Sequence, residues 1–224
     1  MLTKTLAILI GLIALAVPIA ATLGWLGLSL QYLESPMPLH RALGDIVWQT
    51  GTDFLLVAIP MFVLLGEILL RAGITERMYD GIVKWLGWLP GGLMHSNIGS
   101  SALFAATSGS SVATAATIGT VAIPQIKKRG YNEPLFLGTI AAGGTLGILI
   151  PPSINLILYG LLTETSVPEL YLAGFLPGFL LAALFMGTVI VLCLLNPKWG
   201  GQKLNATWRE RFVALPSLIP PLGI

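Results

Sequence analysis

Charge is the property that this sequence has least of. Only 10 % of its 224 residues are Asp, Glu, Lys or Arg, whereas soluble globular chains carry about 25 %. The 12 basic and 10 acidic residues leave a formal net charge of +2, which is too small to favour a nucleic-acid partner. Together with an apolar share of 55 %, this scarcity excludes a soluble enzyme and a disordered tail.

Cysteine is almost absent as well. The single residue, Cys193, cannot form an internal disulfide, which excludes a disulfide-stabilised secreted scaffold. It lies in an apolar run, so we expect it to serve packing. The sequence also offers no His, Cys and Asp cluster for a transition metal and no evident Ser–His–Asp set. We therefore expect neither a transition-metal site nor enzymatic activity.

Uncharged segments, by contrast, are long. Four of the five exceed the ~20 residues that a helix needs to cross a bilayer. A chain with this pattern is predicted to be an all-α polytopic membrane protein, embedded in lipid. The five segments without Asp, Glu, Lys or Arg are 5–33, 54–66, 85–126, 134–163 and 170–197.

The first and last apolar segments set the expected organisation at the two ends. Residues 5–33 extend well beyond the 7–15-residue core of a signal peptide, so we expect a retained first span. Residues 212–224 form an apolar segment shorter than a span. We interpret them as the start of a truncated span, in a chain that is the first half of a larger protein.

The segment 85–126 is too long for one span, and its flanks are both basic. Basic loops lie in the cytoplasm, so this segment must cross the bilayer an even number of times. A polar interruption at Thr107–Ser111 divides it into arms, Leu93–Thr107 and Val112–Ile123. These arms reach only ~22 and ~18 Å as helices, short of the ~30 Å hydrocarbon core. We therefore predict a re-entrant hairpin within residues 91–126.

The next segment, 134–163, contains two signals for a broken helix. Gly143–Gly147 is rich in glycine, and Pro151-Pro152-Ser153 follows. The two prolines remove helical N–H groups, and the residue before a proline avoids the α region. We expect a break between Gly143 and Ser153, with the helix restarting at Pro152 or Ser153.

These predictions divide the chain into four parts. Residues 1–90 hold scaffold-type spans and an interfacial amphipathic helix at 73–89, which could equally be a tail of the preceding span. Residues 91–163 form a transport-type unit with the hairpin and the broken helix. Residues 164–211 add a further span and a cytoplasmic loop, and 212–224 follow. Within the first part, the spacing of Glu67 and Arg71 favours an i,i+4 ion pair over a proton or gating role.

Two discontinuities at similar depth suit ion and anion binding. Unwound carbonyls and helix C-termini coordinate Na⁺, while helix N-termini attract anions. The hydroxyls of Ser108, Ser110 and Ser111 are hard donors for a small cation, and Thr145 with the carbonyls near Gly144, Gly147, Ile148 and Ile150 could complete the shell. Packing of small residues is the alternative, and we favour it for 113–120. Residues expected to face the substrate are Ser110, Ser111, Ser153 and Asn155.

At this point the sequence resembles a known family, the large membrane subunit (DctM type) of tripartite ATP-independent periplasmic (TRAP) transporters. The resemblance runs in order from about residue 5 to residue 200. It rests on 58–62 with Gly66-Glu67, 105–116, Pro124, Gly130-Tyr131 and 144–153.

This resemblance implies a fold, an activity and partners. The fold would be one half of an inverted repeat in an elevator of the ion-transporter-superfamily type. The activity would be sodium symport of an organic acid, such as a C4-dicarboxylate or sialic acid, across the bacterial inner membrane. A periplasmic substrate-binding protein and a small four-helix membrane subunit would be its partners. A single-component sodium-coupled carboxylate carrier, or a sodium/proton antiporter of the same superfamily, is the alternative.

The resemblance also places the sodium site. Its first hairpin tip matches Ser108–Ser111, here called the tip, and its facing broken helix matches Gly144–Pro151. Co-transported Na⁺ is then the only ion expected, with no organic cofactor. The full set of predicted sodium-binding residues is Ser108, Gly109, Ser110, Ser111, Gly144, Thr145, Gly147, Ile148 and Pro151.

Overall fold

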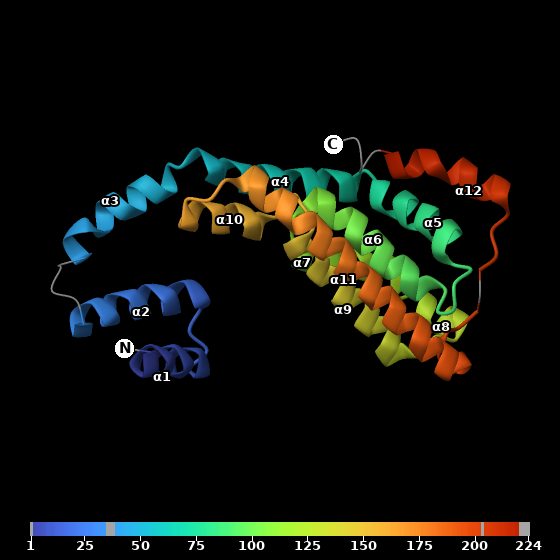
Figure 1. Cartoon of the computed structure of the whole chain (residues 1–224), viewed down its shortest axis with the longest axis horizontal. Coiled ribbons are helices and arrows are strands. Elements are labelled where there is room, and N and C mark those ends of the chain that lie inside the picture. Colours follow the sequence, from blue (N-terminus) through green and yellow to red (C-terminus); the bar gives the residue numbers. More distant parts are fainter. Residues whose placement is uncertain (1, 35–38, 203, 220–224) are drawn as a thin grey trace. The chain divides into compact units, whose positions relative to one another are not determined.

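A computed structural model describes residues 2–34, 39–202 and 204–219 of the chain, and Figure 1 shows its helices. The chain divides into two compact units, 1–54 and 55–224. The first unit contains α1 (Leu2–Ala14), α2 (Ile19–Glu34) and α3 (Leu39–Gly51). The second begins with α4 (Phe54–Arg71) and holds the predicted hairpin and broken helix.

The first apolar segment is not the single span that its length predicted. Its helix ends at Ala14, and α2 begins at Ile19. Pro18 keeps Val17 out of the α region, and Ala16 adopts the left-handed conformation with φ 55°. The two helices fold back on one another. An ion pair shows this, since Lys4 Nζ near the start of α1 lies 2.6 Å from Glu34 Oε1 at the end of α2. Pro18 therefore divides this apolar segment into a helix pair.

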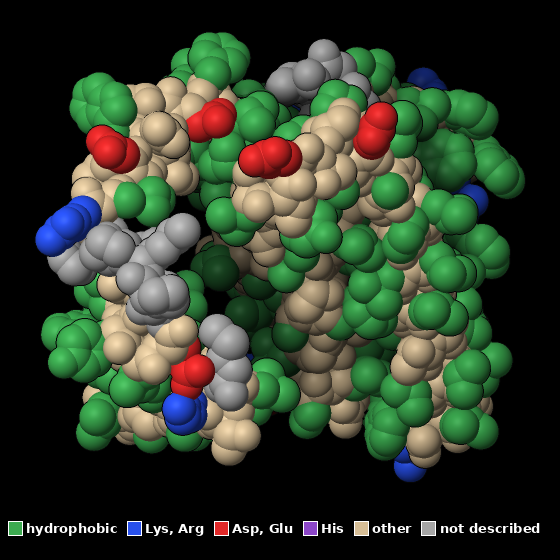
Figure 2. Space-filling model, turned by 60° about the vertical axis from the view of Figure 1, so that its left-hand side comes forward, with side chains coloured by type: hydrophobic (Ala, Val, Ile, Leu, Met, Phe, Trp, Pro, Cys, Tyr) green, Lys and Arg blue, Asp and Glu red, His purple; other side chains and the backbone are tan. Residues whose placement is uncertain are grey.

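Membrane character is borne out by the second unit. Within the described residues, three segments are long and apolar enough to cross a membrane: Phe54–Arg71, Glu133–Thr163 and Val167–Leu195. The last of these is helix α11, whose Leu176, Phe179 and Leu184 side chains are exposed. On the face drawn in Figure 2, hydrophobic side chains cover much of the surface and charged ones are few. Such a surface suits contact with lipid.

Helix α6 (Leu93–Ser108) is the centre of the second unit. It contacts α5 (Ile74–Leu86), α7 (Ser111–Ala122), α9 (Glu133–Leu149) and α11. Its Met94 and Ile98 are fully buried, as are Phe136 and Leu146 of α9. The core thus forms around the segment that the sequence marked as the hairpin, not around the most hydrophobic span.

Helix α5 is separate from α4, so it is not a helical tail of the preceding span, while its position at the membrane interface stays a prediction. Gly73 adopts φ +66° between them and ends the continuity of the backbone. The predicted ion pair lies in the last turn of α4, where Arg71 Nε is 2.6 Å from Glu67 Oε1. Met78 and Tyr79 of α5 are buried against protein, so much of its apolar face packs on α6 and on the C-terminal helices.

The C-terminal segment differs from the expected start of a span at 212. Helix α12 (Trp208–Ala214) already begins at Trp208, because Thr207 and Glu210 form a capping box at its first turn. A short 3₁₀ helix, η2 (Leu215–Leu218), follows. The Trp85 indole nitrogen of α5 donates to the Arg211 carbonyl at 3.2 Å. Residues 220–224 of this predicted span lie outside the described residues.

Candidate functional site

The tip is a tight turn between two helices, α6 and α7. The ends of these helices match the predicted arms to within one residue. Gly109 follows α6 with φ +60°, a conformation that suits glycine. Ser110 then caps α7, since its Oγ accepts from the Ala113 N–H at 3.4 Å. Thr114 Oγ1 donates to the Ser110 carbonyl at 2.7 Å. Capping on both sides of Gly109–Ser110 makes the reversal a property of local sequence.

The chain returns after the tip to the start of α6. Helix α7 leads through α8 (Gln125–Arg129) to Tyr131, and the Leu93 N–H donates to Tyr131 Oη at 2.9 Å. Figure 1 shows α8 beside the beginning of α6. The two arms therefore fold back on one another and leave the tip at the far end.

The broken helix is interrupted over four residues only. Helix α9 continues to Leu149, and α10 (Ile154–Thr163) starts directly after Ser153, one residue beyond the predicted restart. We call Ile150–Ser153 the break. Pro151 and Pro152 lack N–H groups, and Ser153 Oγ donates instead to the Ile148 carbonyl at 2.6 Å. The predicted unwinding from Gly143 onward is thus wrong for 143–149, which stay helical.

Glycines in this part of α9 serve close packing on α6, α7 and the tip. A Cβ on Gly143 would lie 2.6 Å from Ser101 Oγ, and one on Gly144 would lie 2.8 Å from Ala115 Cβ. At Gly147, the Cβ would lie 3.0 Å from the Ser111 backbone nitrogen. The absence of side chains therefore lets the backbone of α9 rest directly on that of the tip.

The tip meets the two helix ends that flank the break at one pocket. The Ile154 N–H of α10 donates to the Gly109 carbonyl at 3.2 Å. Beside this contact lies a pocket of about 280 Å³, here called the junction pocket. It is lined by Gly109, Ser110, Ser111, Val112, Ile148, Ile154 and Asn155.

Four helix ends meet around the junction pocket, and their electrostatics are complementary. Its lining includes Ser111 and Val112 of the first turn of α7, and Ile154 and Asn155 of the first turn of α10. Helix N-termini carry partial positive charge and free N–H groups. Gly109, which follows α6, and Ile148 in the last turn of α9 also line it, and the last carbonyl groups of a helix have no partner within that helix. One pocket can thus offer oxygen ligands to a cation and N–H donors to an anion.

The hydroxyl groups differ in how far they are already used. Ser111 Oγ is buried and has no hydrogen-bond partner among the described residues. Ser108 Oγ lies 3.1 Å from Thr114 Oγ1, and Ser153 Oγ serves the Ile148 carbonyl. Thr145 is exposed and donates to the Ala142 carbonyl of its own helix. Of the predicted hydroxyl ligands, Ser111 is the one whose oxygen is buried and unused.

The structure brings most of the predicted residues together, with three exceptions. Gly109, Ser110, Ser111, Ile148 and Asn155 line the junction pocket. Gly144 and Gly147 of α9 pack against the tip, and Ser108 is a buried residue of the tip itself. Thr145 is exposed and bonded within its own helix, and Pro151 is buried beside Gly174 of α11. Ser153 is fully buried and does not line the pocket.

A buried polar network escaped the sequence analysis. Tyr79 Oη donates to Asn97 Oδ1 at 2.7 Å, and Asn97 Nδ2 donates to Thr139 Oγ1 at 3.0 Å. It joins α5, α6 and α9, and burial raises the pKa of the Tyr79 phenol, so the hydroxyl keeps its proton. An Asn inside an uncharged apolar run is a signal that could have revealed it.

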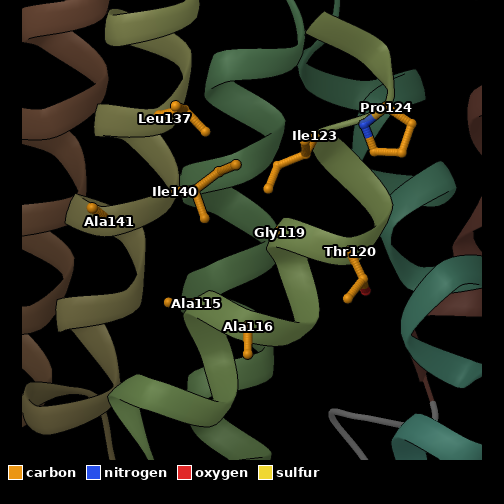
Figure 3. A pocket seen from close by; sticks show the side chains of 9 residues that line it. All are labelled: Ala115, Ala116, Gly119, Thr120, Ile123, Pro124, Leu137, Ile140 and Ala141. Carbon is orange, nitrogen blue, oxygen red and sulfur yellow. The ribbon is translucent and has the colours of Figure 1, made fainter.

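A larger pocket is a different feature. It is a groove of about 470 Å³ between α7 and α9, and Figure 3 shows Ile123 and Ile140 pointing toward each other across it. Its lining is apolar apart from Thr120. Among the described residues no group of His, Cys, Asp or Glu could hold a metal ion. The junction pocket therefore remains the candidate site.

Together these features define a helical membrane protein in which a helical hairpin, α6 and α7, packs against a broken helix, α9 and α10. The chain belongs to the family of the tripartite ATP-independent periplasmic transporter, DctM component, which it matches over residues 6–224. The resemblance expected from the motifs is thereby confirmed. Proteins similar to this chain are transporter permeases rather than enzymes.

Three relatives illustrate the similarity. The large permease protein DctM of a C4-dicarboxylate TRAP transporter from Pseudomonas aeruginosa is 39 % identical over 67 % of this chain and 35 % of its own length. The sialic acid TRAP permease SiaM from Vibrio cholerae is 34 % identical over 96 % of this chain and 51 % of its own length. The ectoine TRAP permease TeaC from Halomonas elongata is 34 % identical over 75 % and 39 %. The chain thus spans between about a third and a half of these relatives.

Proposed function

We propose that this chain contributes one of the sodium- and substrate-binding elements of a TRAP large permease subunit, which transports an organic acid together with Na⁺ across the bacterial inner membrane. The junction pocket carries this proposal. It lies between the tip and the helix ends that flank the break, and it combines a buried unused hydroxyl with four helix ends. Family membership and three candidate spans support a transport role in a membrane.

Sodium would be held by oxygen atoms at the tip side of the pocket. Na⁺ is a small hard cation and prefers hydroxyl and carbonyl ligands. Ser111 Oγ offers the hydroxyl, and the C-terminal ends of α6 and α9 offer carbonyls. Gly144 and Gly147 would act by holding the tip against α9 rather than as ligands through side chains.

The organic acid would be held by N–H groups rather than by cationic side chains. Residues 85–126 and 134–163 contain no Lys or Arg, so a carboxylate there depends on the N-termini of α7 and α10. Asn155 lines the junction pocket and is exposed, so its amide can reach a substrate. The relatives' names include C4-dicarboxylate, sialic acid and ectoine; for this chain we propose an organic acid as the class.

Coupling would follow from differential binding. Sodium orders the tip against the break, the ordered site holds the carboxylate, and only the loaded unit crosses readily. In this account α6 and α7 form a re-entrant hairpin with the tip at mid-membrane depth. A periplasmic binding protein delivers the substrate, and a small four-helix subunit braces the permease.

Uptake into proteoliposomes tests this function. The complete large subunit would be reconstituted with its small partner, and radiolabelled organic acids added with and without binding protein and an inward sodium gradient. Uptake that needs both sodium and binding protein is the expected result. Sodium-dependent uptake without the binding protein would support a single-component carrier instead, and uptake indifferent to sodium would contradict the coupling.

A further inference from the structure

Two loops that are distant in sequence are joined at the end of the unit opposite the tip. Residues 129–132 begin at the last residue of α8, and residues 199–202 begin at the last residue of η1 (Pro197–Trp199). The Gln202 N–H donates to the Arg129 carbonyl at 3.2 Å, and the Asn132 N–H donates to the Trp199 carbonyl at 3.3 Å. Tyr131 and Gly200 pair between these contacts. The two loops therefore form one surface.

Tyr131 fixes this surface to the core. Its ring is buried, and its hydroxyl donates to the Gln202 carbonyl at 3.3 Å while it accepts from Leu93 at 2.9 Å. Burial raises the pKa of this phenol, so its hydroxyl keeps the proton it donates. The loops are thus held in a defined arrangement by the start of α6.

Four cations lie in α8 and η1, at or directly before these joined loops: Lys127, Lys128, Arg129 and Lys198, here called the basic cluster. The three lysines are exposed, and Arg129 Nε donates only to Gln125 Oε1, at 3.1 Å. Both ion pairs found among the described residues lie elsewhere, at Lys4–Glu34 and Glu67–Arg71. The charge of the cluster is therefore available to an external anion.

The basic cluster lies where the candidate span α11 ends. Leu194 and Leu195, the last residues of that span, are 64 % and 71 % exposed, and Trp199 is 36 % exposed one turn beyond. Exposed leucines that are followed by a lysine and a tryptophan mark the passage from hydrocarbon to headgroup region. The cations are thus placed at the level of lipid phosphates.

A second pocket opens at the same end and is here called the end pocket. Its volume is about 190 Å³, and Gly91, Cys193, Pro197 and Gly200 contribute to its lining. Pro197 directly precedes Lys198, and Gly200 is the residue paired with Tyr131. Leu194 also lines it, so the pocket connects the basic loops with an exposed apolar helix surface.

We propose that the basic cluster and the end pocket bind an anionic phospholipid. Its phosphate lies against Lys198 and the α8 cations, its glycerol backbone enters the end pocket, and its acyl chains follow the exposed leucines of α11. Anionic headgroups bind basic pockets beside transmembrane helices on the cytoplasmic side. This binding is independent of sodium and of substrate, so it stands or fails separately from the transport function.

Lipid binding to the purified chain tests the proposal. Native mass spectrometry would count bound lipid during titration with phosphatidylglycerol or phosphatidylcholine, and thermal unfolding in the same mixtures would give a second readout. We expect the anionic lipid to bind more than about tenfold more tightly, since each basic residue near an anionic surface contributes about fivefold. Equal binding of the two lipids would overturn the proposal.

Matched variants locate the site. The triple substitution Lys127→Gln, Lys128→Gln and Lys198→Gln should remove the preference for phosphatidylglycerol, whereas Arg41→Gln, Arg77→Gln and Arg209→Gln, which removes three exposed charges elsewhere, should keep most of it. Circular dichroism would verify that both fold. A preference lost equally in both variants would overturn the site. If inorganic phosphate alone raised the thermal unfolding temperature as much as phosphatidylglycerol does, the cluster would be a general anion site, which would contradict the lipid assignment.

Discussion

Glycine 147 shows how a residue without a side chain can position a site. A Cβ at this position would lie only 3.0 Å from the carbonyl carbon of Ser110 and the nitrogen of Ser111. The absence of a side chain therefore leaves room for the backbone of the tip. The sequence showed the glycines of α9 and suggested unwinding, yet they are helical. Glycine both weakens helices and permits close approach, and sequence alone does not say which applies. The packing partner, which is distant in sequence, decides between them.

Substitution of Gly147 therefore tests the contact between α9 and the tip. We expect Gly147→Ala to destabilise the purified chain by about 1–3 kcal/mol, because the added methyl group overpacks the junction. The control is Gly138→Ala in the same helix, where no described atom lies within 4 Å of the new Cβ; it should raise stability by up to about 1 kcal/mol. Denaturant unfolding in detergent measures both, and equal effects would contradict the packing.

Tyr79 offers a second test at this scale. Tyr79→Phe removes the donor to Asn97 and leaves a buried amide oxygen unpaired, which should cost about 1–3 kcal/mol. Tyr159 is 55 % exposed, so Tyr159→Phe should stay within about 0.5 kcal/mol of the wild type. Comparison of the two unfolding midpoints gives the answer; a neutral Tyr79→Phe would show that the network does not support the core.

At the scale of elements, local chemistry decided which predictions succeeded. The arms of α6 and α7 and the start of α10 were predicted closely, since Ser-Gly-Ser and Pro-Pro-Ser act on their own neighbours through caps and missing N–H groups. The division between α1 and α2 was missed because Pro18 was read within a long apolar run. Helix α12 was missed because its capping box lies in a polar stretch that resembled a loop.

The capping box gives α12 a pH dependence. Hydrogen bonds from the backbone N–H and hydroxyl of Thr207 lower the pKa of the Glu210 carboxyl. Its contribution to the helix start is therefore complete above the unfolded value of about 4.3 and is lost as the pH falls through the lower folded pKa. The Thr207 amide signal in NMR spectra should follow this titration. An unchanged titration in Glu210→Gln would contradict the assignment.

At the scale of the whole molecule, the sequence could predict a membrane protein with two interruptions, but not which surfaces meet. Long uncharged runs are a global property and require no contacts to recognise. The junction pocket, the Tyr79–Asn97–Thr139 network and the joined basic loops each combine segments that are far apart in sequence. Their formation depends on packing around α6, which no local pattern encodes.

The central claim is that the junction pocket binds sodium through the tip, and ²²Na⁺ binding to the purified complete permease tests it most directly. We predict saturable binding that Ser111→Ala weakens about tenfold or more, as even outer-shell changes do at metal sites. Ser29→Ala, whose hydroxyl bonds within its own helix, should leave binding unchanged. Sodium binding of wild-type strength in a folded Ser111→Ala permease would contradict the account.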